Sequence, residues 1–81
     1  MMNNTHRLDS WPRSRPARVT GLQTEDQDLL EGLQEQGFLV GAVVEVLEKG
    51  MFGGTPISVR VGRAIVAVRA REAQAVEVGE L

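Results

Sequence analysis

The stretch ISVRVGRAIVAVR, residues 57–69, decides the fold of this chain. Apolar residues alternate with polar or small ones on both sides of Gly62-Arg63, which is the period-two pattern of half-buried strands. A glycine-first pair also suits the two-residue turn of a tight hairpin. We therefore expect an antiparallel hairpin over 57–69 whose core-facing residues are Ile57, Val59, Val61, Val66 and Val68.

Shorter apolar segments around this hairpin predict the remaining strands. Residues 17–22 and 75–78 are short and valine- or leucine-containing, and residues 42–50 place Val44 and Val46 on one face. Residues 71–74 are long enough for one helical turn. Several short strands in so small a chain cannot build a flat sheet with two buried faces, and closing them into a barrel removes exposed edges. The sequence thus predicts a mostly β protein, a small barrel of about five strands with one short α-helix packed on it.

The helix signal lies in TEDQDLLEGLQEQG, residues 24–37. Thr24 is expected to be the N-cap, with Gln27 completing a capping box. Gly32 costs a helix about 1 kcal/mol relative to alanine, and close packing against a sheet would explain its presence. We expect a helix over 25–36 that rests on the barrel through a narrow apolar stripe. This stripe consists of Leu29, Leu30 and Leu33.

Composition excludes several classes of protein. The chain has 81 residues, enough for one small domain, and contains no cysteine and a single histidine, His6. Such a chain offers neither a thiolate or imidazole metal site nor a nucleophile–histidine pair, so we expect no catalytic residues, no metal site and no cofactor. No apolar run is long enough to span a membrane and the N-terminus lacks a secretory apolar region. These features predict a cytoplasmic, non-enzymatic protein without direct membrane insertion.

Charge is unevenly distributed along the chain. Residues 1–18 contain four arginines and one aspartate, whereas residues 25–35 contain five acidic side chains and no basic one. Pro12 and Pro16 exclude a helix from the first segment. We expect residues 1–15 to form a partly flexible arm and residues 16–81 to form the domain. Either Leu8 and Trp11 lay this arm across the barrel, or the first several residues are mobile.

The glycine-rich connection KGMFGGTP, residues 49–56, is the main candidate for function. Its glycines lack the spacing and the Lys-Ser/Thr of a phosphate-binding loop. Apolar residues beside them favour a protein partner, since such residues are a liability in water unless covered. Phe52 has an alternative, which is to fold inward and cap the barrel. The predicted docking face joins this loop to the acidic helix and consists of Met51, Phe52, Gly53, Gly54, Glu31 and Glu35.

The order and spacing of several short motifs resemble the FeoA family over residues 8 to 81. The resemblance implies an SH3-like barrel with a helix on it, and a role in bacterial ferrous iron uptake. It implies an accessory module that binds or regulates FeoB, a membrane transporter with a cytoplasmic GTPase domain, and that is neither a catalyst nor an iron carrier. The matching positions are Gly37, Gly41, Val44, Val46, residues 53–56, 57–62, 67–69, 72–73 and 76–78.

Two alternative functions stay open. Arg60, Arg63, Arg69 and Arg71 cluster around the hairpin, which suits a nucleic-acid- or ribosome-associated barrel, although no aromatic platform accompanies them. The formal net charge of −2 also argues against a phosphate-driven binder, so no nucleic acid is expected. The second alternative is a barrel similar to the C-terminal domain of iron-dependent repressors. Self-assembly into a homo-oligomer is left open by the sequence.

Overall fold

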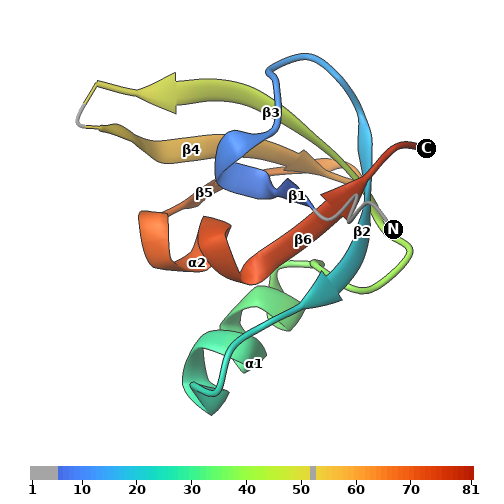
Figure 1. The fold of residues 1–81 in the computed structure, drawn as a ribbon, viewed down its shortest axis with the longest axis vertical. Helices are drawn as coiled ribbons and strands as arrows, with labels where there is room; N and C mark the ends of the chain where they lie inside the picture. Colours follow the sequence, from blue (N-terminus) through green and yellow to red (C-terminus); the bar gives the residue numbers. More distant parts are fainter. Residues whose placement is uncertain (1–5, 52) are drawn as a thin grey trace, which may run out of the picture.

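Six antiparallel strands form one strongly curved sheet in the computed structural model, which describes residues 6–51 and 53–81 (Figure 1). Their order across the sheet is β1-β6-β2-β3-β4-β5. The mostly β barrel expected from the sequence is confirmed, with one strand more than the predicted five and a second short helix. The elements are β1 (His6–Arg7), η1 (Leu8–Ser10, a 3-10 turn), β2 (Ala17–Leu22), α1 (Gln27–Glu35), β3 (Val43–Gly50), β4 (Gly54–Val61), β5 (Ala64–Val68), α2 (Ala70–Ala75) and β6 (Val76–Gly79).

The barrel is open on one side. β1 and β5 are the two ends of the strand order and do not pair with each other. Helix α2 lies at this opening, where it contacts η1, β1, β4 and β6. The expectation that closure removes every strand edge is therefore wrong, because no described strand pairs with the outer edge of β5.

The central hairpin forms as predicted. β4 and β5 pair in continuous antiparallel register, with Val59 opposite Val66 and Val61 opposite Ala64. Gly62 has a positive φ of 60°, the backbone conformation that a glycine-first hairpin turn requires. Of the five residues expected in the core, four are buried and Val66 is half-buried and packed against them. The period-two pattern thus assigned the inner face of the sheet correctly.

The N-terminal segment contributes to the core from residue 6 onward. β1 pairs with β6, and both Leu8 and Trp11 are buried. The Trp11 indole Nε1 donates a hydrogen bond to the Arg15 backbone oxygen at 2.7 Å, and the Arg15 guanidinium lies over the indole ring. Arg15 also forms an ion pair with Glu80. Of the two arrangements left open by the sequence, the structure has Leu8 and Trp11 packed on the barrel.

Helix α1 begins later than expected. Asp26, and not Thr24, is the N-cap, and its carboxylate accepts a hydrogen bond from the Leu29 backbone N–H at 3.1 Å. The Thr24 hydroxyl instead accepts from the Asp26 N–H at 3.1 Å. Leu33 is buried, whereas Leu29 and Leu30 are half-buried. Leu33 lies in the core and Leu29 packs against it, so these two residues anchor the helix on the barrel.

The explanation expected for Gly32 is wrong. A Cβ built at Gly32 would meet no atom within 4 Å, so no neighbour packs closely there.

We expect Gly32→Ala to stabilise the protein by about 1 kcal/mol, because alanine restricts the unfolded chain and fits the open space. In a domain of this size the melting temperature should rise by roughly 4–8 °C. Gly37→Ala is the matched control. Gly37 has a φ of 102°, and a Cβ there would lie 3.0 Å from Val61 Cγ1, so this variant should be destabilised. Equal melting temperatures for the two variants would contradict the placement of both glycines.

Candidate functional site

The hairpin formed by β3 and β4 ends in a short, glycine-rich turn between Gly50 and Gly54, called the tip below. Gly50 pairs with Gly54, and a Cβ on Gly50 would overlap the backbone carbonyl of Thr55. Gly53 and Gly54 both have positive φ, of 64° and 84°. β4 begins at Gly54, so the connection is shorter than the expected 49–56 and Pro56 belongs to the strand. The glycines are present because the two backbones approach closely and turn sharply.

Met51 is the apolar residue presented by this tip. Its side chain is 94% exposed, more than that of any other large hydrophobic residue in the described part of the chain. Phe52, the second apolar residue expected there, lies outside the described residues. Exposure of so large an apolar side chain at the end of a projecting hairpin suits contact with another macromolecule.

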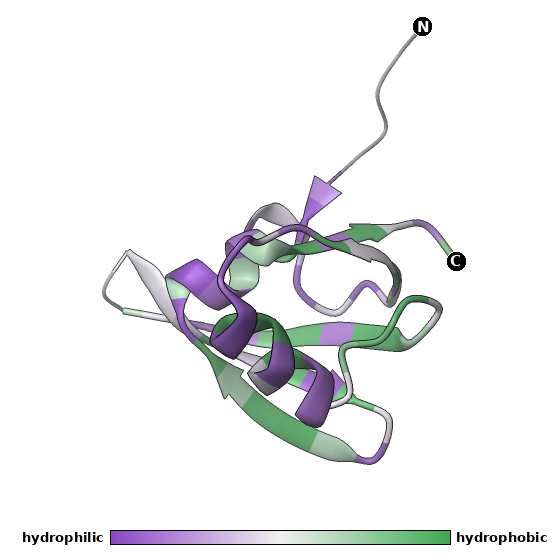
Figure 2. Cartoon of the chain, turned by 90° about the horizontal axis from the view of Figure 1, so that it is seen from below, coloured by the Kyte–Doolittle hydropathy of each residue, from purple (hydrophilic) through white to green (hydrophobic). Residues whose placement is uncertain are grey.

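The acidic helix forms a second surface. Glu31 and Glu35 are exposed on α1, one helical turn apart. Figure 2 shows the hydrophilic side of α1 facing outward, with the hydrophobic strands behind it. In Figure 1 the tip of the β3–β4 hairpin and α1 lie at different ends of the molecule. Of the predicted docking residues that the structure describes, Met51, Gly53 and Gly54 lie at the tip and Glu31 and Glu35 lie on α1, so these five do not form one patch.

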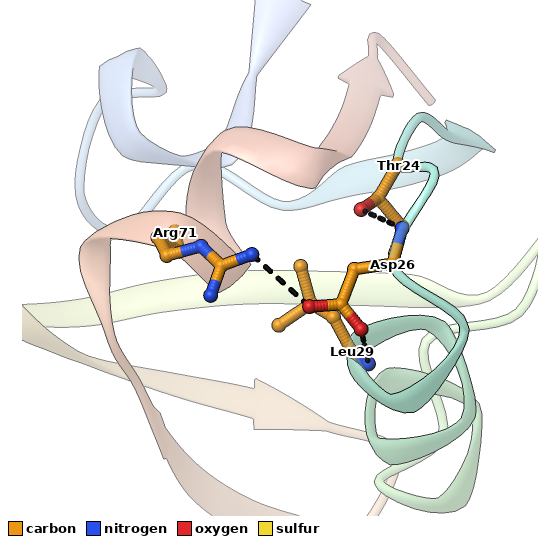
Figure 3. Close-up of polar contacts among 4 residues, drawn as sticks. All are labelled: Thr24, Asp26, Leu29 and Arg71. Atoms are coloured by element: carbon orange, nitrogen blue, oxygen red, sulfur yellow. Dashed lines mark hydrogen bonds and ion pairs between the residues drawn. The ribbon is translucent and has the colours of Figure 1, made fainter.

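Asp26 joins α1 to α2 (Figure 3). One carboxylate oxygen caps the Leu29 N–H, and the other accepts a hydrogen bond from Arg71 Nη2 at 3.1 Å. The Leu29 N–H and the Arg71 guanidinium hold the pKa of the Asp26 carboxyl below its ordinary value. The carboxylate is therefore the favoured form in the folded protein, and it ties together two helices that are far apart in sequence.

We expect stability to depend on pH through Asp26. A carboxyl whose folded pKa is lowered stabilises the fold fully above its unfolded pKa of about 3.9, and this contribution is lost as the pH falls through the folded value. Asp26→Ala should lower the denaturant midpoint at pH 7, and its difference from the parent should shrink below about pH 4. Asp26→Asn retains a capping oxygen and should be the more stable variant at pH 7. A difference between the parent and Asp26→Ala that stays constant with pH would contradict this role.

A polar groove lies beside this bridge. Its volume is about 270 Å³, and it opens where β1, the turn before α1, the first turn of α1 and helix α2 meet. No sequence signal pointed to it, because its lining comes from four segments that only the fold brings together. The lining residues are Arg7, Gln23, Thr24, Leu29, Arg71, Gln74 and Ala75.

Metal ligands do not cluster in the described residues. No three histidine, cysteine, aspartate or glutamate side chains among them are placed to hold an ion. The expectation that the chain carries no iron of its own stays a prediction. None of the helices within residues 6–51 and 53–81 is long and apolar enough to cross a membrane.

Comparison with known proteins identifies close relatives of this fold. The FeoA domain model matches residues 6–80. A zinc complex of Stenotrophomonas maltophilia FeoA is 33% identical, with 90% of this chain and 88% of that chain covered and a TM-score of 0.78. That protein is described as a prokaryotic SH3 domain protein and a candidate ferrous iron transport activating factor.

Two further structures share the fold over most of the chain. Iron(II) transport protein A from Clostridium thermocellum is 29% identical with a TM-score of 0.85. The match covers 94% of this chain but 46% of that one. A manganese-dependent transcriptional repressor has a TM-score of 0.87 at 22% identity, with 100% of this chain and 44% of the repressor covered, which shows a shared fold alone. No curated protein matches the chain in sequence.

Proposed function

Because the chain belongs to the FeoA domain family, we propose that it is an accessory module of bacterial ferrous iron uptake that binds the cytoplasmic part of a FeoB-type transporter. The observation that carries this proposal is the family match over residues 6–80. The 33% identical relative, described as a candidate transport activating factor, supports it. In this role the chain acts in the cytoplasm as a binding module and not as an enzyme.

The tip of the β3–β4 hairpin is the proposed apolar contact. Met51 loses no internal packing when a partner covers it, because its side chain is already 94% exposed. Burying such a side chain at the centre of an interface removes apolar surface from water, which favours binding. A few central residues of this kind usually contribute most of the binding energy. Phe52 belongs to the same proposed contact, with Gly53 and Gly54 setting the shape of the tip.

The exposed face of α1 is the proposed electrostatic contact. Glu31 and Glu35 lie on a different part of the molecule from the tip, so they act as a charged region that orients an approaching basic surface. Exposed charges of this kind change the association rate more than the final affinity, and salt screens them. Glu31→Lys with Glu35→Lys should therefore slow association at low salt and leave dissociation nearly unchanged.

The test is direct binding to the transporter. The tagged protein is immobilised and exposed to the purified cytoplasmic GTPase domain of a FeoB transporter, and in parallel to detergent-solubilised membranes containing it. We expect saturable, one-to-one binding and retention of the transporter from the membranes. Failure to bind either preparation, with the protein shown to be folded, would overturn the proposed function.

A further inference from the structure

No strand within residues 6–51 and 53–81 pairs with the outer edge of β5. β5 is the last strand of the sheet and has five residues, whereas the strand at the other edge, β1, has two. A two-residue turn makes Val61 and Ala64 a hydrogen-bonded pair, and such pairs alternate along an antiparallel ladder. The backbone groups of Ile65 and Ala67 therefore point away from β4, towards the open side, and both residues are exposed.

This edge lacks most of the features that protect sheet edges from pairing, which are a short strand, a bulge, a proline, an inward charge or a covering helix or loop. Helix α2 lies at the same opening, but its main contacts are with η1, β1, β4 and β6, and Ile65 and Ala67 remain exposed. β5 has continuous register with β4 and contains no proline and no charged residue. Its second residue is Ile65, which is β-branched and 63% exposed. An extended segment could add here through main-chain hydrogen bonds, as in other strand-addition complexes.

The surrounding charge selects an acidic segment. Arg63 precedes β5 and Arg69 follows it, both are exposed, and neither forms an ion pair with any residue of the described chain. Arg60 lies directly opposite Ile65 on the outer face of the sheet. Arg60 is held loosely by Glu45 at 3.5 Å, with its own side chain half exposed. Arginines at both ends and one beside Ile65 favour a strand that carries carboxylates.

A second copy of the chain fits this edge poorly. Antiparallel pairing of β5 with the β5 strand of a second copy uses all the outward backbone N–H and C=O groups only if Ile65 lies opposite Ala67 of the other copy. This register places the twofold axis at Val66. Arg63 then faces Arg69 of the other copy at both ends, and like charges directly opposite each other destabilise a sheet. A single-stranded nucleic acid finds no phenylalanine or tryptophan stacking surface among the described residues, since the side chains of Trp11 and Phe38 are buried.

The geometry points to β5 as a docking edge for an extended acidic segment of a protein partner, which adds to the six-stranded sheet as a further strand. Main-chain bonds to Ile65 and Ala67 provide the pairing, the exposed Ile65 side chain packs against an apolar residue of the segment, and the arginines bind its carboxylates. This surface is distinct from the tip and from the acidic face of α1. It does not require that the partner be the transporter.

The test uses a capped peptide of alternating glutamate and valine, slightly longer than β5, titrated into the isotope-labelled full chain at low salt and followed by NMR. We expect shift changes concentrated on β5, slowed amide exchange at Ile65 and Ala67, and binding at least about tenfold tighter than that of the matching lysine–valine peptide. Ala67→Pro removes one outward N–H without touching the bonds to β4, and should weaken binding by about tenfold or more.

A charge-reversed variant keeps the proposal testable if the proline variant does not fold. Arg63→Glu with Arg69→Glu should reverse the preference towards the lysine–valine peptide, whereas Arg18→Glu on β2 should leave it unchanged. Shift changes centred elsewhere, equal binding of both peptides, or tighter binding of an oligothymidine than of the acidic peptide would overturn the proposal. Transporter binding is not measured in this titration, so this proposal and the proposed function fail separately.

Discussion

Phe38→Ala is expected to unfold most of the protein at room temperature. Phe38 is fully buried and, after Trp11, is the largest buried side chain in the described part of the chain. It follows directly on α1, and its backbone N–H donates to the Leu33 oxygen at 3.0 Å, so its ring anchors the end of the helix in the core. Removing a buried phenylalanine ring costs about 3–5 kcal/mol through lost burial and the cavity left behind. A domain this small has a total stability of about the same size.

The measurement is a denaturant titration followed by circular dichroism, with Leu39→Ala as the matched control. Leu39 is the next residue along the chain and is 52% exposed, so its truncation should change stability by less than about 0.5–1 kcal/mol. The two variants truncate neighbouring residues, so they differ mainly in how deeply the removed side chain is buried. A Phe38→Ala variant with the parent's midpoint would contradict the placement of this ring.

The inner face of the sheet was predictable because burial leaves a regular mark on the sequence. Each strand of the central hairpin is long enough to show alternation, and Gly62 marks the turn between them. β1 escaped prediction because two residues show no period, and its pairing with β6 depends on a partner about 70 residues away.

The outer surface was less predictable, since few sequence signals report on it. Thr24 and Asp26 are both good capping residues. Asp26 is the N-cap of α1 in the structure, and its carboxylate also binds Arg71, a contact that the sequence does not reveal because the two residues are far apart in the chain. The spatial separation of the predicted docking residues could not be foreseen for a related reason. Met51 and Glu31 are both recognisable as exposed residues, but only the curvature of the sheet determines how far apart they lie.

Met51→Ser is expected to weaken binding to the transporter's cytoplasmic domain by more than about 2 kcal/mol, which is about 30-fold, while the melting temperature stays at the parent value. The two readouts separate because the Met51 side chain is 94% exposed in the free protein and contributes almost nothing to its core. Val40→Ser is the matched control. Val40 is 70% exposed, but it lies before the start of β3, whereas the tip lies at the other end of this strand. The Val40→Ser variant should therefore bind like the parent. Equal losses for both variants would indicate a general effect of surface hydrophobicity and contradict a contact at the tip.

Phe52→Ser extends the same experiment to the neighbouring position, which lies outside the described residues. If Phe52 contacts the partner, the variant should keep its melting temperature and lose affinity by more than about 2 kcal/mol. If Phe52 instead folds inward and caps the barrel, stability falls first, and the loss of binding follows from unfolding. A drop of more than about 8 °C in the melting temperature, which is roughly 1 kcal/mol or more in a domain of this size, would assign Phe52 to the core. Met51 would then be left as the apolar contact of the tip.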